Sequence, residues 1–345
     1  MELGLSTFGE LNPDHKAGGA VNAHLRMQEL LEEIKLADEV GLDVFAIGEH
    51  HREDYLVSVP EMVLAAGASI TKNIRLSSAV TVLSSSDPVR IFQNYATLDL
   101  ISGGRAEIMA GRGSFTESFP VFGKDLNHYD DLFAEHLDLL IQLNQSEKIS
   151  WRGKFRPSLN NVGIYPRPLQ EEIPVWLAVG GTPSSAIRAA KLNLPMTLAF
   201  IGGTPDRFVS FANLYKEQAK AANHAVDKTR FALNTHFYAA ETSQQAMEEF
   251  YKPYTTVMNR IGRERGWSPM GWDHYEFMRD HGPMMVGSPE QITDKILLFH
   301  EMFGNTRYLA QLMTGPSMPH TKTLHAIELF GTKIAPAVRK ALQNQ

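Results

Sequence analysis

Two copies of the tetrapeptide Gly-Gly-Thr-Pro, at 180–183 and 202–205, are the first residues that could bind a ligand. Each copy follows a short apolar run and precedes a segment with helical spacing. Glycine lets the backbone approach a ligand closely, and the free amides at a helix start attract an anion. Taken singly, either turn could instead be a short connection with a good helix cap. The candidate binding residues in the two turns are Gly180, Gly181, Thr182, Gly202 and Gly203.

Arg112 follows another apolar run and adds a permanent positive charge to this set. A guanidinium group offers a planar fork of donors that suits a phosphate. Two glycine turns and one arginine together favour a phosphate site at one end of the strands. The alternative is a loop arginine that pairs with Glu107 or Glu117.

His50 and His51 follow the second apolar run. Alternate side chains of a strand diverge, so only one of the two can face a pocket there. A histidine in that place can act as a general base or proton donor near neutral pH. The alternative is one histidine in a surface hydrogen bond and the other in packing. Adjacent histidines are poorly placed to chelate one ion, and the chain has no His-Glu-x-x-His motif, so we predict no metal site.

Eight short apolar runs alternate with longer segments of helical period, a pattern typical of a parallel sheet with crossover helices. Most are continuously apolar, which indicates strands buried on both faces. The predicted strands are 2–8, 43–48, 74–83, 105–111, 174–179, 195–201, 229–240 and 307–314. Two clear helices are predicted over 22–40 and 129–144. Four further helices are predicted to begin at Asp87-Pro88, Thr182-Pro183, Thr204-Pro205 and Ser288-Pro289, each with a side-chain acceptor as cap.

Eight such units predict a (β/α)8 TIM barrel, with the functional site at the carboxyl ends of the strands. A barrel of this kind needs about 250 residues, so part of the 345-residue chain is extra. We predict one domain over 1–345, with insertions at about 145–173 and 251–287, the first a hairpin and the second a cap over the site. The alternative is an open doubly wound sheet, but no Gly-x-Gly-x-x-Gly follows the first strand.

The composition excludes several classes of function. The chain has 33 Lys and Arg against 39 Asp and Glu, a formal charge of −6, and no cysteine. Disulfides, thiolate metal sites and a cysteine nucleophile are therefore absent. The acidic balance argues against nucleic acid and an anionic membrane as partners. No apolar stretch approaches the roughly 18–20 residues of a membrane span, and the first residues do not resemble a signal peptide. We expect a soluble, cytoplasmic protein.

Several segments together resemble the bacterial luciferase-like monooxygenases. The second strand with its Gly-Glu-His-His ending and the fourth strand with its Gly-Arg-Gly loop are the most characteristic parts. The similar segments follow the family's order over essentially the whole chain: 41–51, 87–90, 101–107, 111–113, 119–123, 180–183, 287–290 and 327–330. Each motif is weak alone, but the set is specific.

This resemblance implies a barrel that binds FMN, usually reduced, with O2 as the second reactant. Arg112, Gly180, Gly181 and Thr182 would hold the phosphate, with Gly202 and Gly203 beside it. Ala79 and Val80 would form the family's non-prolyl cis peptide against the flavin ring, and His50 would be the catalytic histidine. The implied activity is oxidation of a small, largely apolar organic molecule, with a separate flavin reductase as a candidate partner.

Some alternatives stay open. The same barrel could use the deazaflavin F420 for hydride transfer, could bind flavin without catalysis, or, least favoured, could be a metal-dependent hydrolase. Ser84 stands where many relatives have proline. Gly181-Thr182 replaces the acidic residue and serine of light-emitting members, so light emission is not predicted. Apolar helices near 60–70 and 88–100, with Met62, Ile70, Val89 and Phe92 among their residues, could form a homodimer interface.

Overall fold

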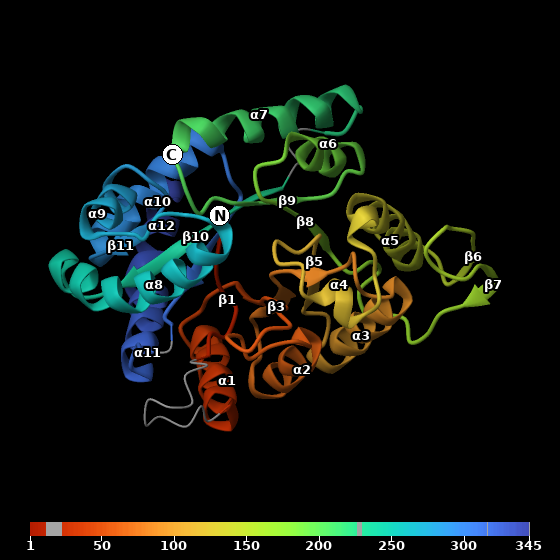
Figure 1. The fold of residues 1–345 in the computed structure, drawn as a ribbon, viewed down its shortest axis with the longest axis horizontal. Helices are drawn as coiled ribbons and strands as arrows, with labels where there is room; N and C mark the ends of the chain where they lie inside the picture. Colours follow the sequence, from red (N-terminus) through yellow and green to blue (C-terminus); the bar gives the residue numbers. More distant parts are fainter. Residues whose placement is uncertain (12–22, 226–229, 316, 345) are drawn as a thin grey trace.

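The apolar runs pair as parallel strands that close into a barrel in a computed structural model of the chain (Figure 1). The structure describes residues 1–11, 23–225, 230–315 and 317–344. The order around the barrel is β1-β2-β3-β5-β8-β9-β10-β12; β9 pairs with β10, and β12 pairs with β1. The prediction of a (β/α)8 barrel is therefore confirmed, and the open sheet is wrong.

Each predicted strand of the described chain forms, although most are shorter than predicted. The run 74–83 divides into β3 and β4, which lie on either side of the cis peptide Ala79–Val80 and both pair with β5. The predicted starts at 22 and 229 lie outside the described residues. The barrel strands are β1 Glu2–Thr7, β2 Val44–Ile47, β3 Arg75–Ser78, β4 Thr81–Val82, β5 Ala106–Gly111, β8 Val175–Val179, β9 Met196–Ala199, β10 Phe231–Ala239 and β12 Arg307–Leu312.

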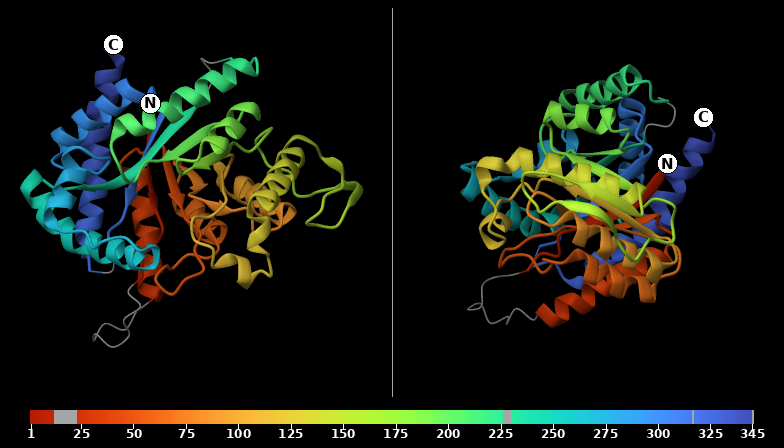
Figure 2. Two further views of the ribbon diagram at one scale, coloured as in Figure 1. Left: turned by 45° about the horizontal axis from the view of Figure 1, so that its top comes forward. Right: turned by 90° about the vertical axis from the view of Figure 1, so that its right-hand side faces the viewer.

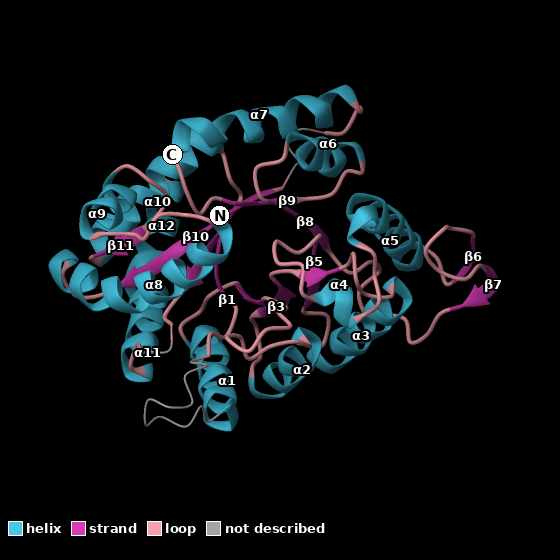
Figure 3. Cartoon of the chain, in the orientation of Figure 1, coloured by secondary structure: helices cyan, strands magenta, loops and turns pink. Residues whose placement is uncertain are grey.

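The helices cover the outside of the barrel (Figures 1 and 3). Their bounds are α1 Ala23–Glu39, α2 Pro60–Ile70, α3 Pro88–Ser102, α4 Ser118–Val121, α5 Tyr129–Gln145, α6 Pro183–Lys191, α7 Pro205–Ala221, α8 Ser243–Arg265, α9 Trp272–Asp280, α10 Pro289–Phe303, α11 His320–Leu329 and α12 Ala335–Gln343. A short 3-10 helix spans Leu126–His128, and a π-helix spans Phe330–Ile334. None of the helices in the described ranges is long and apolar enough to cross a membrane.

Two segments lie outside the repeating pattern. Strands β6 Lys148–Trp151 and β7 Leu159–Gly163 form an antiparallel hairpin beyond α5, at the periphery of the molecule (Figures 1 and 2). The segment 251–287 contributes the end of α8, all of α9 and a short strand β11 Met285–Gly287 beside β10, which the sequence did not indicate. That these segments are insertions in a single domain stays a prediction.

Helix caps follow the predicted pattern only in part. Asp87 accepts hydrogen bonds from the amides of Val89 and Arg90, and Ser288 accepts one from Gln291. Thr182 and Thr204 occupy the same position before α6 and α7, but neither side chain makes a cap hydrogen bond. The cap prediction is therefore wrong at both Gly-Gly-Thr-Pro turns, so their helix-start amides are not satisfied by the threonines.

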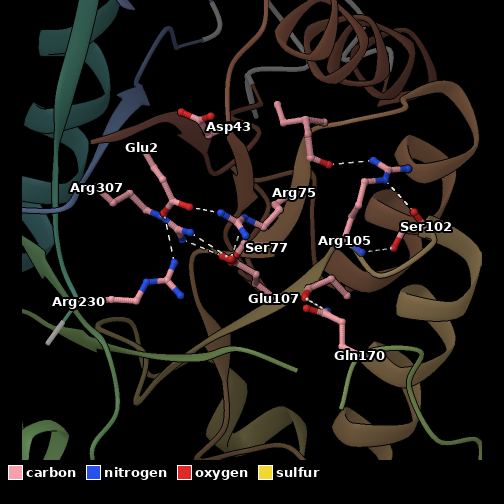
Figure 4. Close-up of polar contacts among 12 residues, drawn as sticks. Glu2, Asp43, Arg75, Ser77, Ser102, Arg105, Glu107, Gln170, Arg230 and Arg307 are labelled. Atoms are coloured by element: carbon pink, nitrogen blue, oxygen red, sulfur yellow. Dashed lines mark hydrogen bonds and ion pairs between the residues drawn. The ribbon is translucent and has the colours of Figure 1, made fainter. Parts of the chain in front are cut away.

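A cluster of ion pairs with a buried centre lies at the amino-terminal ends of the strands (Figure 4). We call Glu2, Arg75, Glu107, Arg230 and Arg307 the basal ion cluster. Arg307 and Glu107 are fully buried and form a bidentate pair, with N–O distances of 2.7 and 3.0 Å. Arg307 also lies 4.1 Å from the ring centre of Trp176, inside the barrel. The carboxyl ends of the strands form the opposite mouth of the barrel, where a ligand site is expected.

Candidate active site

A cavity of ≈ 320 Å³ opens at the carboxyl ends of the strands. Its volume lies at the lower end of the range usual for small-molecule sites, about 300–1,000 Å³. Its lining is mostly apolar, with a few polar groups: Phe8, Glu49, His50, Ala79, Val80, Val82, Met109, Gly111, Arg112, Gly113, Ser114, Phe115, Tyr129, Ala178, Val179, Gly180, Thr182, Thr197, Ala199, Asn234 and Gln311. The site is therefore at the mouth where a barrel is expected to carry its chemistry.

The cavity brings together most of the residues singled out in the sequence. His50, Ala79, Val80, Arg112, Gly180 and Thr182 all line it. Gly181, Gly202 and Gly203 do not belong to its lining. Gly181 and Gly203 instead flank the ring of Phe208, from which an added Cβ would lie 3.7 and 3.4 Å away. The two Gly-Gly-Thr-Pro turns thus lie on either side of the Phe208 ring. The roles of all these residues stay predictions.

Arg112 is held at the rim by the first turns of α5 and α6. Its Nη1 lies 2.5 Å from the Oδ1 of Asp130, and its Nη2 donates to the Oγ of Ser185 at 3.2 Å and to the Oγ1 of Thr182 at 3.5 Å. The alternative partners Glu107 and Glu117 are wrong, because Glu107 belongs to the basal ion cluster and Glu117 contacts His50. Asp130 is exposed, so an incoming anion can compete with it for the guanidinium.

Aromatic rings surround His50, which is 8% exposed. Tyr55 stacks on it with ring centres 4.3 Å apart, and Phe8 and Phe115 approach edge-on at 4.6 and 5.1 Å. Its Nδ1 lies 3.5 Å from the Oε1 of Glu117, within ion-pair distance but outside hydrogen-bond geometry. Burial would raise the pKa of Glu117, but its interactions with His50 and nearby backbone amides outweigh burial and lower that pKa. Glu117 is therefore a carboxylate that favours a proton on Nδ1.

His51 lies off the cavity, as expected for one of two adjacent histidines. Its Nε2 lies 2.9 Å from the Oε1 of Glu49, and its ring packs edge-on against Phe122. The other oxygen of Glu49 accepts a hydrogen bond from the amide of Val82 at 2.7 Å. Glu49 thus fixes the histidine loop to β4.

The Ala79–Val80 peptide is cis, as the resemblance implies, and both residues line the cavity. Gly111 allows Val80 to pack directly on β5, because a Cβ at Gly111 would lie 2.5 Å from the Val80 side chain. This contact presents a small apolar surface to the cavity.

The end of α8 meets the mouth of the barrel through contacts that local sequence does not reveal. Arg265 of α8 and Arg52 after β2 both lie over Phe115, at 4.8 and 4.9 Å from its ring centre. Arg52 also pairs with Glu264 of α8. Phe115 is therefore held in place at the cavity by two guanidinium groups from distant segments.

The described residues include no cluster of three or more His, Asp or Glu side chains that could hold a metal ion. They do fit an anionic ligand with a flat apolar part. Arg112 and Ser185 supply donors at the rim, and no atom lies within 4 Å of the position of a Cβ at Gly180, so a ligand has room there. Ala79 and Val80 supply a small apolar surface in the same cavity.

Comparisons with known proteins agree with this arrangement. A sequence model of the family described as luciferase-like monooxygenase matches residues 1–306. The chain is 24% identical to limonene 1,2-monooxygenase of Rhodococcus erythropolis, over 97% of this chain and 87% of that protein.

Solved structures show the same fold. The monooxygenase RslO1 from Streptomyces bottropensis matches with a TM-score of 0.84 and 24% identity, over 97% of this chain and 99% of that one. The oxygenating constituent of 3,6-diketocamphane monooxygenase from Pseudomonas putida, in complex with FMN, gives 0.79 and 21%, over 98% of both chains. An F420-dependent secondary alcohol dehydrogenase gives 0.75 and 18%, over 98% and 99%. Identities this low establish the fold alone.

Proposed function

The chain belongs to the luciferase-like monooxygenase family, and on that premise we propose that it is an FMN-dependent monooxygenase. It would use reduced FMN and O2 to oxidise a small, largely apolar organic molecule. The observation that carries this proposal is that Arg112 and His50 line one cavity, together with the apolar surface of Ala79 and Val80. The relative solved with FMN has the same fold, which supports a flavin in this barrel.

Each group of side chains has a distinct task in this proposal. Arg112, Thr182, Ser185 and the amides at the start of α6 bind the phosphate. Bound reduced flavin supplies the electrons that activate O2. His50 holds or transfers a proton at Nε2, since Glu117 favours the proton on Nδ1. Phe8 and Phe115 help to exclude water from the cavity.

Replacing Arg112 by alanine is expected to raise the dissociation constant for FMN and FMNH2 about 10- to 100-fold. A charge-assisted hydrogen bond contributes about 1.5–3 kcal/mol, and this variant removes the donor. The matched variant Asp130→Asn removes the carboxylate that competes for the same guanidinium. The dissociation constant of this variant for FMN should therefore stay level or fall. Equilibrium titration of both variants tests this. Absence of saturable binding to the native chain, or equal binding by Arg112→Ala, contradicts the proposal.

An alternative keeps the barrel and uses F420 for hydride transfer without oxygen. It is favoured by the likeness to the F420-dependent secondary alcohol dehydrogenase. The side chains of the cavity do not separate the two cofactors, since both are ring systems with a phosphate. Anaerobic turnover with reduced F420, and none with FMNH2 and O2, would select this alternative.

A homodimer, a separate flavin reductase and a cytoplasmic location are further parts of the proposal. The predicted dimer surface is wrong at Phe92, because its side chain is fully buried. The exposed apolar side chains of α2 and α3 are Met62, Ile70, Leu100 and Ile101. This exposed set is our candidate interface.

Light scattering at micromolar concentration is expected to give twice the chain mass of 38.5 kDa. The double variant Met62→Asp/Ile101→Asp should give the monomer mass, because each charge would lose its water at a packed interface. A native chain that is already monomeric would remove the dimer from the proposal.

A further inference from the structure

The cavity has two unlike sides within the barrel. Ala79, which directly follows β3, and Met109 of β5 line one side of it, and these side chains are apolar. Strands β9, β10 and β12, across the barrel, present Thr197, Asn234 and Gln311. A polar patch of this kind is unusual inside a barrel, where bulky apolar side chains dominate.

Two of these polar side chains are almost completely buried and keep an unpaired atom. Thr197 is 2% exposed and Asn234 is 7% exposed. The Oγ1 of Thr197 and the Oδ1 of Asn234 have no hydrogen-bond partner. The Nδ2 of Asn234 donates to the Oγ of Ser6 at 2.8 Å. If the two amide atoms are exchanged, Nδ2 becomes the unpaired atom, so Asn234 keeps one free polar atom in either orientation.

The register of the sheet places both side chains on the inner face. Ala199, which lies directly opposite Asn234, lines the cavity, and so does Thr197 two residues before it. The intervening Leu198 and Leu233 belong to the outer core between strands and helices. Buried polar atoms are normally hydrogen-bonded, and an unpaired one costs stability. Two such atoms on one cavity wall indicate a ligand that completes them.

We propose that Thr197 and Asn234 bind a neutral oxygen function of the substrate, a carbonyl or a hydroxyl group. This inference rests on the proposed function and assigns the two residues to the substrate, not to the cofactor. The apolar body of the substrate lies toward Phe8 and Phe115 in the same cavity. The substrate class is thus a small apolar molecule that already carries one oxygen group.

The charges around the cavity favour a neutral group over an ionised one. Among the described lining residues, the permanently charged or acidic side chains are Glu49 and Arg112. Both carboxylate oxygens of Glu49 have partners, and Arg112 is paired with Asp130 at the rim. An ionised substrate group beside Thr197 and Asn234 would lack a counter-charge, which makes its burial costly. A carbonyl or hydroxyl group has no such cost once it is hydrogen-bonded.

The experiment compares matched molecules with and without oxygen. Cyclohexanone, cyclohexanol and methylcyclohexane, and 2-decanone and decane, are titrated into FMN-loaded protein and followed by flavin absorbance. The same panel is measured on cofactor-free protein by ligand-observed NMR. Native protein is expected to bind the oxygen-bearing members about tenfold more tightly than the hydrocarbons. Each neutral hydrogen bond accounts for about two- to tenfold.

Two variants assign this preference to the residues. Thr197→Val should lose about two- to tenfold in ketone affinity, and Thr197→Val/Asn234→Leu should bind ketone and hydrocarbon equally. FMN affinity should stay within about twofold, because charge-assisted contacts to the phosphate at Arg112 are unchanged. A loss of FMN affinity above tenfold would assign the residues to the cofactor and overturn the inference. Equal binding of ketones and hydrocarbons by native protein, or no binding of either, would overturn it too.

A neighbouring threonine provides the control. The Oγ1 of Thr235 faces the outer core and pairs with the hydroxyl of Tyr308 at 2.6 Å. Thr235→Val should lower the thermal midpoint and leave the ketone preference intact. Thr197→Val should keep the midpoint level or raise it, since it removes an unpaired hydroxyl. If Thr197→Val lowers the midpoint as Thr235→Val does, the hydroxyl has a structural partner and the inference is wrong. Failure of FMN to bind the native chain would end the proposed function separately, because the NMR panel does not need the cofactor.

Discussion

Glu107→Gln is expected to lower the free energy of unfolding by about 3–5 kcal/mol, because it breaks a buried ion pair from one side. Glu107 is fully buried and accepts hydrogen bonds from both terminal nitrogens of Arg307. It also lies 3.1 Å from the Nε of Arg75. Without its charge, Glu2 would be the only carboxylate of the basal ion cluster facing Arg75, Arg230 and Arg307 (Figure 4). Urea denaturation followed by circular dichroism measures the effect.

The control for this experiment is an exposed pair with the same chemistry. Glu53 is exposed and lies 3.2 Å from Arg260. Glu53→Gln should change the free energy of unfolding by less than about 1 kcal/mol, as exposed ion pairs generally do. If Glu107→Gln costs no more than Glu53→Gln, the basal ion cluster is held together by hydrogen bonds alone and its charges are not needed. FMN affinity should change little in either variant, because both positions are away from the cavity lining.

The barrel could be predicted because each strand has a recognisable pattern in its own short stretch of sequence. A run such as Val175–Val179 is apolar at every position, and only a strand covered on both faces needs that. The basal ion cluster could not be predicted in the same way. Its members come from five separate segments, and Glu107 and Arg307 are 200 residues apart in sequence. Nothing near either residue indicates that closure of the barrel makes them partners.

The residues of the candidate site could likewise be predicted only in part. His50 and Arg112 could be found because they follow strands, and a barrel brings strand ends together. Their partners Glu117 and Asp130 could not be found, because loop conformation decides which carboxylate reaches which group. Thr197 and Asn234 did leave a signal. Thr197 is the one polar residue of the strand Met196–Ala199, and Asn234 begins a polar stretch within the buried strand Phe231–Ala239. Strand alternation would have placed both inside the barrel.

His50→Gln is expected to lower kcat about 10²- to 10⁴-fold, the usual contribution of a positioned general acid or base. Glutamine keeps a polar side chain among Phe8, Tyr55 and Phe115 but cannot exchange a proton near neutral pH. The rate is measured as oxygenated product formed from the best substrate of the ketone panel, with FMNH2 supplied by a reductase. Peroxide released without product is recorded in parallel. FMN affinity should change by less than about threefold, since the phosphate contacts at Arg112 remain.

A variant of the adjacent histidine distinguishes a loss of proton transfer from a disturbed loop. His51 lies on the same loop, but it contacts Glu49 and Phe122 and is not part of the cavity lining. His51→Gln keeps a group that can hydrogen-bond to Glu49, and its kcat should stay within about threefold of the native value. If both variants lose activity equally, the loop as a whole is required, and His50 has no separate role. If His50→Gln forms product at the native rate, the proton is handled elsewhere in the cavity. The proposed role of His50 in proton transfer is then wrong, whatever the role of Arg112 in binding the phosphate.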